Sequence, residues 1–140
     1  MITASDPDRP RVRLAPQQQG FSSYLGPFYE LELPSGWRRA LPIEARHLNP
    51  EGFVHGGVIA GFIDYVLYRA IGDQLGHEQA FATAQLNIQF LSAARAGSWL
   101  FGEGMIVKRT RSLVFASGEI FAEQQSVAHA SGIWKLIGQG

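Results

Sequence analysis

The sequence predicts an α+β fold in which an antiparallel sheet wraps around one long central helix. Two patterns carry this prediction. Residues 56–75 are apolar nearly all the way round a helix, and a helix without a polar face is normally buried. Four β-rich stretches with short connections follow, and consecutive strands of this kind form antiparallel sheets. One buried helix beside one sheet is a two-layer α+β domain.

Length, composition and charge limit the class of protein. The 140 residues suit a single domain, and 46% of them are hydrophobic, which is enough for a core. Twelve Lys and Arg balance twelve Asp and Glu, so the chain lacks the charge expected for binding nucleic acid or an anionic membrane. No apolar run approaches the roughly 20 residues of a membrane span. Without cysteine, disulfide and thiol chemistry are excluded, and we expect a soluble, cytoplasmic protein.

The chain before the long helix is less regular. Residues 1–20 are rich in Pro, Arg, Asp and Gln without an apolar period, which predicts a flexible or surface-draped arm ahead of a domain at 21–140. Residues 28–33 alternate as a strand does, and residues 38–45 are a second candidate strand that Pro42 weakens. An Asn-Pro pair and three glycines then predict a loop before the helix.

The helix and the strands after it complete the predicted domain. The helix runs from about Gly56 to Leu75, with Gly72 and Gly76 as stop signals. Turn residues separate four strand-like stretches, which we expect to pair in chain order as an antiparallel meander. These stretches are residues 81–91, 98–109, 113–123 and 126–137.

Asp64 is the unusual residue of the apolar helix. A lone buried carboxylate costs several kcal/mol unless it is paired, hydrogen-bonded or protonated. Its neighbours toward the helix N-terminus on the same face are small: Gly57, Ala60 and Gly61. Because helical side chains tilt toward the N-terminus, Asp64 should point into open space rather than into packed leucines. The pattern favours a functional carboxylate that faces a cleft.

The start of the helix offers a complementary group. Backbone N–H groups in the first turn have no intrahelical acceptor, so those near Gly56 can bind developing negative charge, and glycine lets a ligand approach closely. Asn49 lies at the same loop. Gly56 and Asp64 are eight residues apart, roughly 12 Å along a helix, which an aspartate side chain cannot span. If both act on one electrophile, they belong to different subunits of a homodimer with antiparallel helices.

The spacing of these residues is similar to a known pattern. Asn49, Gly52, His55, Gly56, Gly57 and Asp64 match N-x-x-G-x-x-H-G-G followed by an aspartate. The chain thereby resembles the hotdog-fold acyl-CoA thioesterases of the PaaI type, which are 4-hydroxybenzoyl-CoA thioesterase-like, over residues 21–137. The resemblance implies a hotdog fold and hydrolysis of an acyl-CoA thioester to a free carboxylic acid and CoA. It implies no cofactor beyond the CoA of the substrate and no metal.

The resemblance also implies roles for single residues. Asp64 would activate water or attack the thioester carbonyl itself, and the Gly56 N–H would polarise that carbonyl. Asn49 would orient the water or hold the loop, and Thr83, on the strand after the helix, would position the carboxylate or the water. His55 and Gly57 are expected to support the loop.

CoA needs cations for its phosphates. Four cationic residues lie at predicted strand ends, where similar enzymes hold the nucleotide. For each of them, an equal alternative is a solvent-exposed position at the end of a hairpin without a role in binding. The four residues are Arg95, Lys108, Arg109 and Arg111. We expect a homodimer, associating further into a tetramer as a dimer of dimers, and we expect no nucleic acid or membrane as a partner.

Several alternatives stay open. Asp64 could form a buried ion pair with Arg46 or Arg69. A non-catalytic acyl-CoA binding module would carry the same pattern with a degenerate site. Hotdog dehydratases and hydratases share the fold, but the spacing from His47 to Asp64, and an arginine at position 69, match both poorly.

Overall fold

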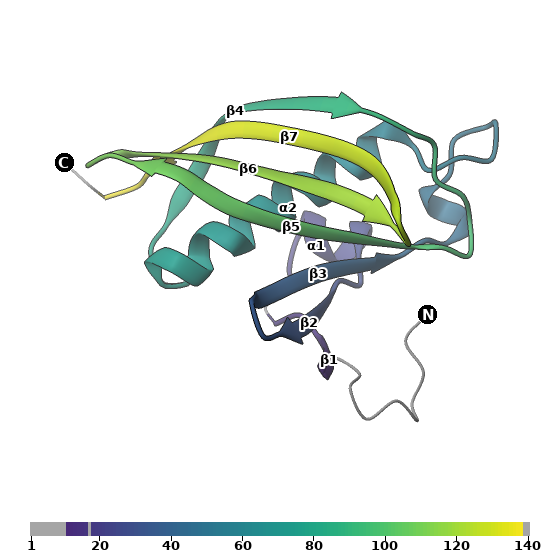
Figure 1. Ribbon diagram of the computed structural model, residues 1–140, viewed down its shortest axis with the longest axis horizontal. Coiled ribbons are helices and arrows are strands. Elements are labelled where there is room, and N and C mark those ends of the chain that lie inside the picture. The colour runs from purple at the N-terminus through teal and green to yellow at the C-terminus, as the bar shows by residue number, and fades with distance from the viewer. Residues whose placement is uncertain (1–10, 17, 139–140) are drawn as a thin grey trace.

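The computed structural model describes residues 11–16 and 18–138 and confirms the predicted fold class (Figure 1). These residues form a seven-stranded antiparallel sheet that curls around the long helix α2 (Gly56–Leu75). The other elements are β1 (Arg11–Leu14), α1 (Phe21–Leu25), β2 (Tyr29–Leu33), β3 (Gly36–Pro42), a 3₁₀ turn η1 (Ala45–His47), β4 (Phe81–Phe90), β5 (Trp99–Arg109), β6 (Leu113–Ala122) and β7 (Gln125–Leu136).

The order of the strands corrects one prediction. The sheet runs β1-β2-β3-β5-β6-β7-β4, so only β5, β6 and β7 form the expected meander. β4 pairs instead with β7 at the far edge, from Phe81 opposite Leu136 to Phe90 opposite Ala128. The connection from β4 to β5 is no tight hairpin, because it runs past the loop before α2, where the Val54 N–H donates to the Ala94 carbonyl (2.8 Å). β5 is thereby delivered next to β3.

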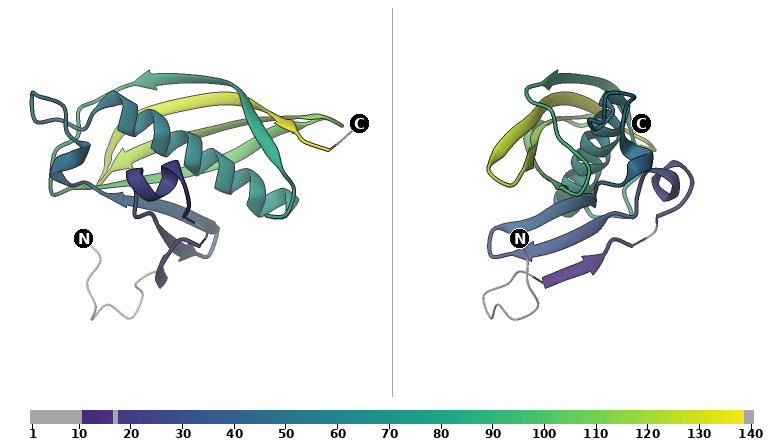
Figure 2. Two further views of the ribbon diagram at one scale, coloured as in Figure 1. Left: turned by 180° about the vertical axis from the view of Figure 1, so that it is seen from behind. Right: turned by 90° about the vertical axis from the view of Figure 1, so that its right-hand side faces the viewer.

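The segment that the sequence predicts as an N-terminal arm includes a short edge strand. Residues 11–14 form β1, which pairs antiparallel with β2, since Arg-Val-Arg-Leu has the alternation of a half-buried strand. Residues 1–10 lie outside the described residues. Helix α1 follows and lies beside the N-terminal half of α2 (Figure 2, left), with Leu25 buried between them.

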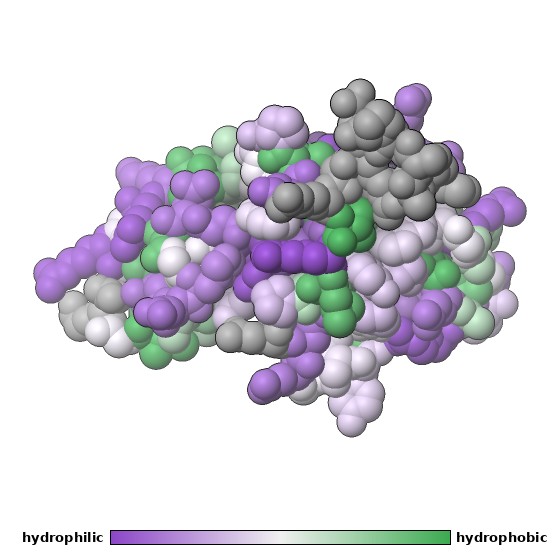
Figure 3. Space-filling view, turned by 90° about the horizontal axis from the view of Figure 1, so that it is seen from below, coloured by the Kyte–Doolittle hydropathy of each residue, from purple (hydrophilic) through white to green (hydrophobic). Residues whose placement is uncertain are grey.

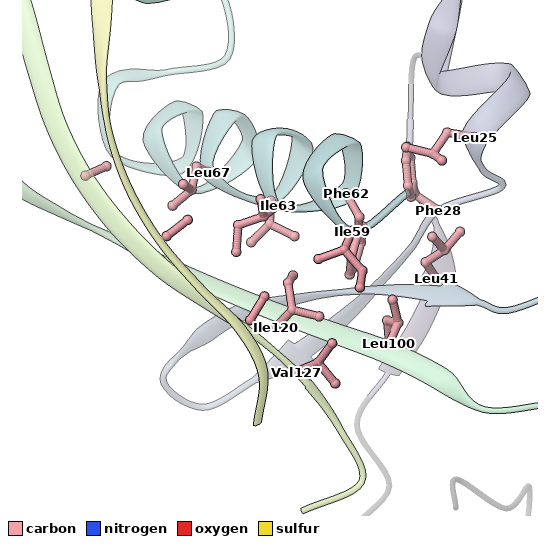
Figure 4. Close-up of a cluster of buried hydrophobic side chains, with 14 of the residues drawn as sticks. Leu25, Phe28, Leu41, Ile59, Phe62, Ile63, Leu67, Leu100, Ile120 and Val127 are labelled. Carbon is pink, nitrogen blue, oxygen red and sulfur yellow. The ribbon is translucent and has the colours of Figure 1, made fainter. Parts of the chain in front are cut away.

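The core lies between α2 and the inner face of the sheet (Figure 4). Ile59, Phe62, Ile63 and Leu67 point from the helix toward Leu100, Ile120 and Val127 of the strands. Glycines allow the close approach. A Cβ at Gly102 would lie 2.5 Å from Val66, and one at Gly104 would lie 2.7 Å from Leu67.

A buried ion cluster fastens the β2–β3 hairpin to α2. Arg39 is 2% exposed and pairs with Glu30 (2.7 Å) and with Asp73 (2.5 Å). Arg69 adds a second cation to Glu30 at 3.2 Å. Burial by itself raises the pKa of Glu30, but Arg39 and Arg69 outweigh it and hold that pKa below its ordinary value.

The face seen in Figure 3 is polar over most of its area, with hydrophobic patches separated from one another. Among the described residues, no helix is long and apolar enough to cross a membrane.

Candidate active site

His55 starts the helix α2. Its Nδ1 accepts the Gly57 N–H at 2.8 Å, and its carbonyl accepts the N–H groups of Val58 (2.9 Å) and Ile59 (3.2 Å). The side chain is thus an N-cap, which explains its place before two glycines. Within the described part of the chain, the Gly56 N–H is the first-turn donor that has no acceptor. The predicted amide is therefore free to bind a ligand.

Gly56 is not required by packing. A Cβ at this position would meet the ring of Phe90 at 3.6 Å, an ordinary contact distance. Phe90 itself is 56% exposed, at the end of β4. The free amide consequently lies beside an exposed aromatic ring.

Asp64 is partly buried and is held by Thr83 of β4. The Thr83 hydroxyl donates to Asp64 Oδ1 at 2.8 Å. Thr83 lies at a register shift between β4 and β7, where a β-bulge bends the strand. The other carboxylate oxygen has no hydrogen-bond partner in the described residues, so it can accept a proton from a ligand or a water molecule.

The alternative ion pair for Asp64 is wrong. Arg46 donates to the carbonyls of Tyr24 and Gly26 and pairs with Glu44 at 2.9 Å. Arg69 pairs with Glu30 in the buried ion cluster described above. The carboxylate of Asp64 therefore bonds a hydroxyl and no cation among the described residues.

The loop at Asn49 has the turn role that the sequence left open. Asn49 Oδ1 accepts the N–H groups of Glu51 (3.1 Å) and Phe53 (3.0 Å), and Gly52 takes a positive φ of 88° that favours glycine. These bonds shape the loop ahead of His55. The side-chain nitrogen of Asn49, Nδ2, takes part in none of them, so a contact between Nδ2 and substrate stays a prediction.

The small-residue face of α2 is only partly open. At Gly61 a Cβ would lie 2.8 Å from Leu25 and 3.3 Å from the ring of Phe21, so α1 fills the space expected there. Gly57 is exposed, and Tyr68, one turn after Asp64, is 44% exposed. Sequence reasoning did not select Phe21 and Phe90, because isolated aromatic residues in apolar stretches ordinarily indicate core. The adjacent apolar pair Phe90-Leu91, which breaks the alternation of the strand, was the one signal.

The structure separates the four predicted cations. Arg95 lies near the start of β5, over the ring of Phe53 at 5.1 Å, on the side where α2 begins. Lys108, Arg109 and Arg111 lie at or just after the end of β5, on the side where α2 ends (Figure 1). A strand of 11 residues spans about 36 Å, so one chain does not bring Arg95 together with the other three.

The remaining polar residues near the loop have structural partners. His47 is 2% exposed; its Nδ1 accepts the Glu44 N–H, so its Nε2 carries the proton that it donates to the Leu25 carbonyl at 2.7 Å. His47 thus supports α1 rather than facing Asp64, unlike the histidine of a dehydratase site. In residues 11–16 and 18–138, no three His, Asp or Glu side chains gather as metal ligands do.

Comparison with known proteins agrees with this geometry. The family model of the thioesterase superfamily matches residues 51–129, from the Asn49 loop through the middle of β7. A Pseudomonas aeruginosa protein named "Putative esterase" is 31% identical over 113 residues, which cover 80% of this chain and 84% of that protein.

Solved structures share the fold. A Bacillus halodurans protein crystallised with CoA is 25% identical, with a TM-score of 0.71 over 77% of this chain and 72% of that one. A Ralstonia eutropha protein named "putative thioesterase, phenylacetic acid degradation-related protein" is 27% identical, with a TM-score of 0.66 over 71% and 74% of the two chains. Together with the family match, they show that the chain belongs to the thioesterase superfamily, as a PaaI-type thioester hydrolase with the hotdog fold.

Proposed function

We propose that the protein hydrolyses acyl-CoA thioesters to a free carboxylic acid and CoA, at a site shared by Asp64 of one subunit and Gly56 of the partner subunit. CoA enters as part of the substrate, with no further cofactor and no metal. The proposal depends on one observation: among the described residues, Thr83 holds one oxygen of the Asp64 carboxylate, and neither the other oxygen nor the Gly56 N–H has a hydrogen-bond partner.

Each group has one task in this reaction. The free oxygen of Asp64 accepts a proton from water as the water oxygen attacks the thioester carbonyl, or attacks that carbon itself to form an anhydride that water then opens. The Gly56 N–H and the positive end of α2 stabilise the negative charge that develops on the carbonyl oxygen. When the carbon–sulfur bond breaks, the CoA thiolate leaves and takes up a proton.

A dimer built through β4 supplies the second subunit. β4 has only β7 as a neighbour in the described sheet, and its ten residues include no charge and no proline that would block pairing. A twofold axis at this edge would pair β4 with its copy and set the two α2 helices antiparallel. The exposed face of α2, with Gly57 and Tyr68, would then meet the partner subunit. We also propose the dimer of dimers, to be tested by native mass spectrometry.

The same arrangement gives the separated cations a common role. In a dimer with antiparallel helices, Lys108, Arg109 and Arg111 of one subunit lie on the same side of the dimer as Arg95 of the other subunit. Cations from two subunits could in this way approach one CoA molecule and pair with its phosphates.

Asp64→Asn tests the proposal directly. The amide keeps the volume and the bond to Thr83 but removes the proton acceptor, so CoA release from a panel of aryl- and alkyl-CoA thioesters should fall by about 10³-fold. The melting temperature should stay the same or rise, because a partly buried charge is removed.

Two results would contradict the proposal. A wild-type dimer that releases no CoA from any thioester would exclude the substrate class. An Asp64→Asn enzyme with wild-type turnover would exclude the carboxylate. A single turnover in H₂¹⁸O tests for the anhydride route, since an oxygen of Asp64 appears in the product acid only when an anhydride forms and water opens it at the Asp64 carbonyl.

A further inference from the structure

Helix α1 presents an exposed aromatic ring to the catalytic face of α2. Phe21 is 69% exposed, although its ring edge would lie only 3.3 Å from a Cβ at Gly61. Leu25, on the same face of α1, is buried at the same glycine, 2.8 Å from that Cβ position. Leu25 therefore anchors α1 to α2, whereas Phe21 covers the surface of α2 and leaves most of its ring uncovered.

The ring lies where the Asp64 side chain is directed. Gly61 precedes Asp64 by three residues, so the two share one face of the helix. A helical side chain leans toward the N-terminus and covers the turn before its own Cα, which for Asp64 is the turn that contains Gly61. Thr83 hydrogen-bonds the carboxylate from β4, and Phe21 of α1 covers the Gly61 turn toward which that carboxylate leans.

Other exposed rings continue this apolar border. Tyr68 is 44% exposed one turn after Asp64 of the same chain, whereas Phe90, 56% exposed beside Gly56, would border that Asp64 only from the partner subunit of the proposed dimer. Sites for small molecules commonly combine apolar walls with a few polar groups that fix the reacting atoms. Rings around one carboxylate and one free amide match that description and suit an acyl chain next to its thioester carbonyl.

The segment that leads into the catalytic loop also holds α1 in place. Arg46 donates to the carbonyls of Tyr24 and Gly26, and His47 donates to the Leu25 carbonyl at 2.7 Å. Both donors lie in η1, at the start of the loop that continues to Asn49 and His55. Phe21 is therefore part of a helix whose position is fixed relative to the site.

We propose that Phe21 forms a wall of the acyl pocket and limits the size of the acyl group that the enzyme accepts. This inference rests on the proposed thioesterase function and adds a specificity-determining residue to it. Residues 21–25 lie outside the range 51–129 that the family model matches.

The experiment compares Phe21→Ala, Phe21→Trp and a control, Tyr24→Ala, with wild type. Tyr24 is on the same helix and is 79% exposed, but it does not reach Gly61. For each enzyme, kcat/KM is measured with straight-chain acyl-CoA from two to twelve carbons and with benzoyl- and phenylacetyl-CoA. Size-exclusion chromatography and thermal melts accompany each variant.

The expected result is a change in preference. Phe21→Ala should raise the ratio of kcat/KM for the largest accepted acyl groups to that for the smallest by about tenfold, and Phe21→Trp should lower it. Tyr24→Ala should keep the wild-type ratio. A Phe21→Ala enzyme that is folded and dimeric with an unchanged ratio would overturn the role of Phe21.

Further outcomes distinguish a failure of the specificity role of Phe21 from a failure of the proposed thioesterase function. A wild-type enzyme inactive on every thioester would overturn the proposed function and, with it, this role. Equal loss on all substrates, or dissociation of the Phe21→Ala dimer with an unchanged ratio, would overturn the specificity role alone and assign Phe21 to packing between helices or subunits.

Discussion

At the scale of single residues, the amide of Gly56 can be removed without removing the helix. Gly56 is the first residue of α2, a position that tolerates proline because its N–H has no intrahelical acceptor. The residue before it, His55, has φ −62° and ψ 138°, the extended conformation that proline requires of its predecessor. Substitution here separates catalysis from folding.

Gly56→Pro and Gly56→Ala form a matched pair. Both add carbon atoms beside Phe90, but only proline deletes the N–H. We expect Gly56→Pro to lower kcat by about 10²-fold or more and Gly56→Ala to lose much less, with both melting temperatures close to wild type. Steady-state kinetics measures kcat for each variant, and thermal melts measure the melting temperatures. Equal activity in the two variants would show that the amide does not bind the carbonyl oxygen.

The residues of the site were predictable where their chemistry is local. Asp64 stands out in the sequence because it is a charge in an apolar helix. Gly56 stands out as one of two adjacent glycines at a helix start, and Asn49 as an asparagine in a turn. All three signals involve only residues close in the chain. The bond from Thr83 was expected only through family resemblance, since it joins a helix to a strand. The sequence could not predict the capping role of His55, because either ring nitrogen, or neither, could have accepted the Gly57 N–H.

At the scale of elements, the Glu30 cluster ties the β2–β3 hairpin to α2 and makes this contact sensitive to acid. The folded-state pKa of Glu30 lies below the ordinary value of 4.5. A carboxylate of this kind stabilises the fold fully above the unfolded-state pKa. That stability is lost as the pH falls through the lower folded-state pKa.

Glu30→Gln tests this dependence. At pH 7 the variant should be about 3 kcal/mol less stable, because two buried arginines lose a charged partner. Its stability should also fall less than that of wild type between pH 5 and the acid transition. Urea unfolding across this range gives both quantities, with the exposed Glu119→Gln as the control. Parallel pH profiles for Glu30→Gln and wild type would contradict the assignment.

Elements with a strong internal pattern were predicted with nearly the right bounds, and so was the pairing of β5, β6 and β7, but the place of β4 in the sheet was not. The helix from Gly56 to Leu75 matches its prediction, since its periodicity and stop signals are local. β1 and α1 are too short, at four and five residues, for a period to emerge. The position of β4 beside β7 depends on side-chain packing between residues far apart in the chain.

At the scale of the whole molecule, a shared site predicts complementation. Asp64→Asn and Gly56→Pro each leave one half of the site intact. Co-expressed, they should form mixed dimers in which one of the two sites contains both wild-type groups, giving about a quarter of the wild-type activity under random pairing.

Isolation of the doubly tagged mixed dimer and measurement of its CoA release tests this expectation. Each parental variant, purified alone, is the control and should be nearly inactive. A mixed dimer no more active than its parents would place both groups within one chain and contradict the shared site.

The pairing of Thr83 with Trp134 links activity to the order of protein synthesis. β4 leaves the ribosome soon after α2, yet its neighbour in the described sheet, β7, is translated last of the described strands. A nascent chain therefore has Asp64 but nothing to fix the bulge from which Thr83 reaches it. The carboxylate acquires its hydrogen-bonded position only when translation of this domain is nearly finished, so a chain truncated before β7 should lack a functional site.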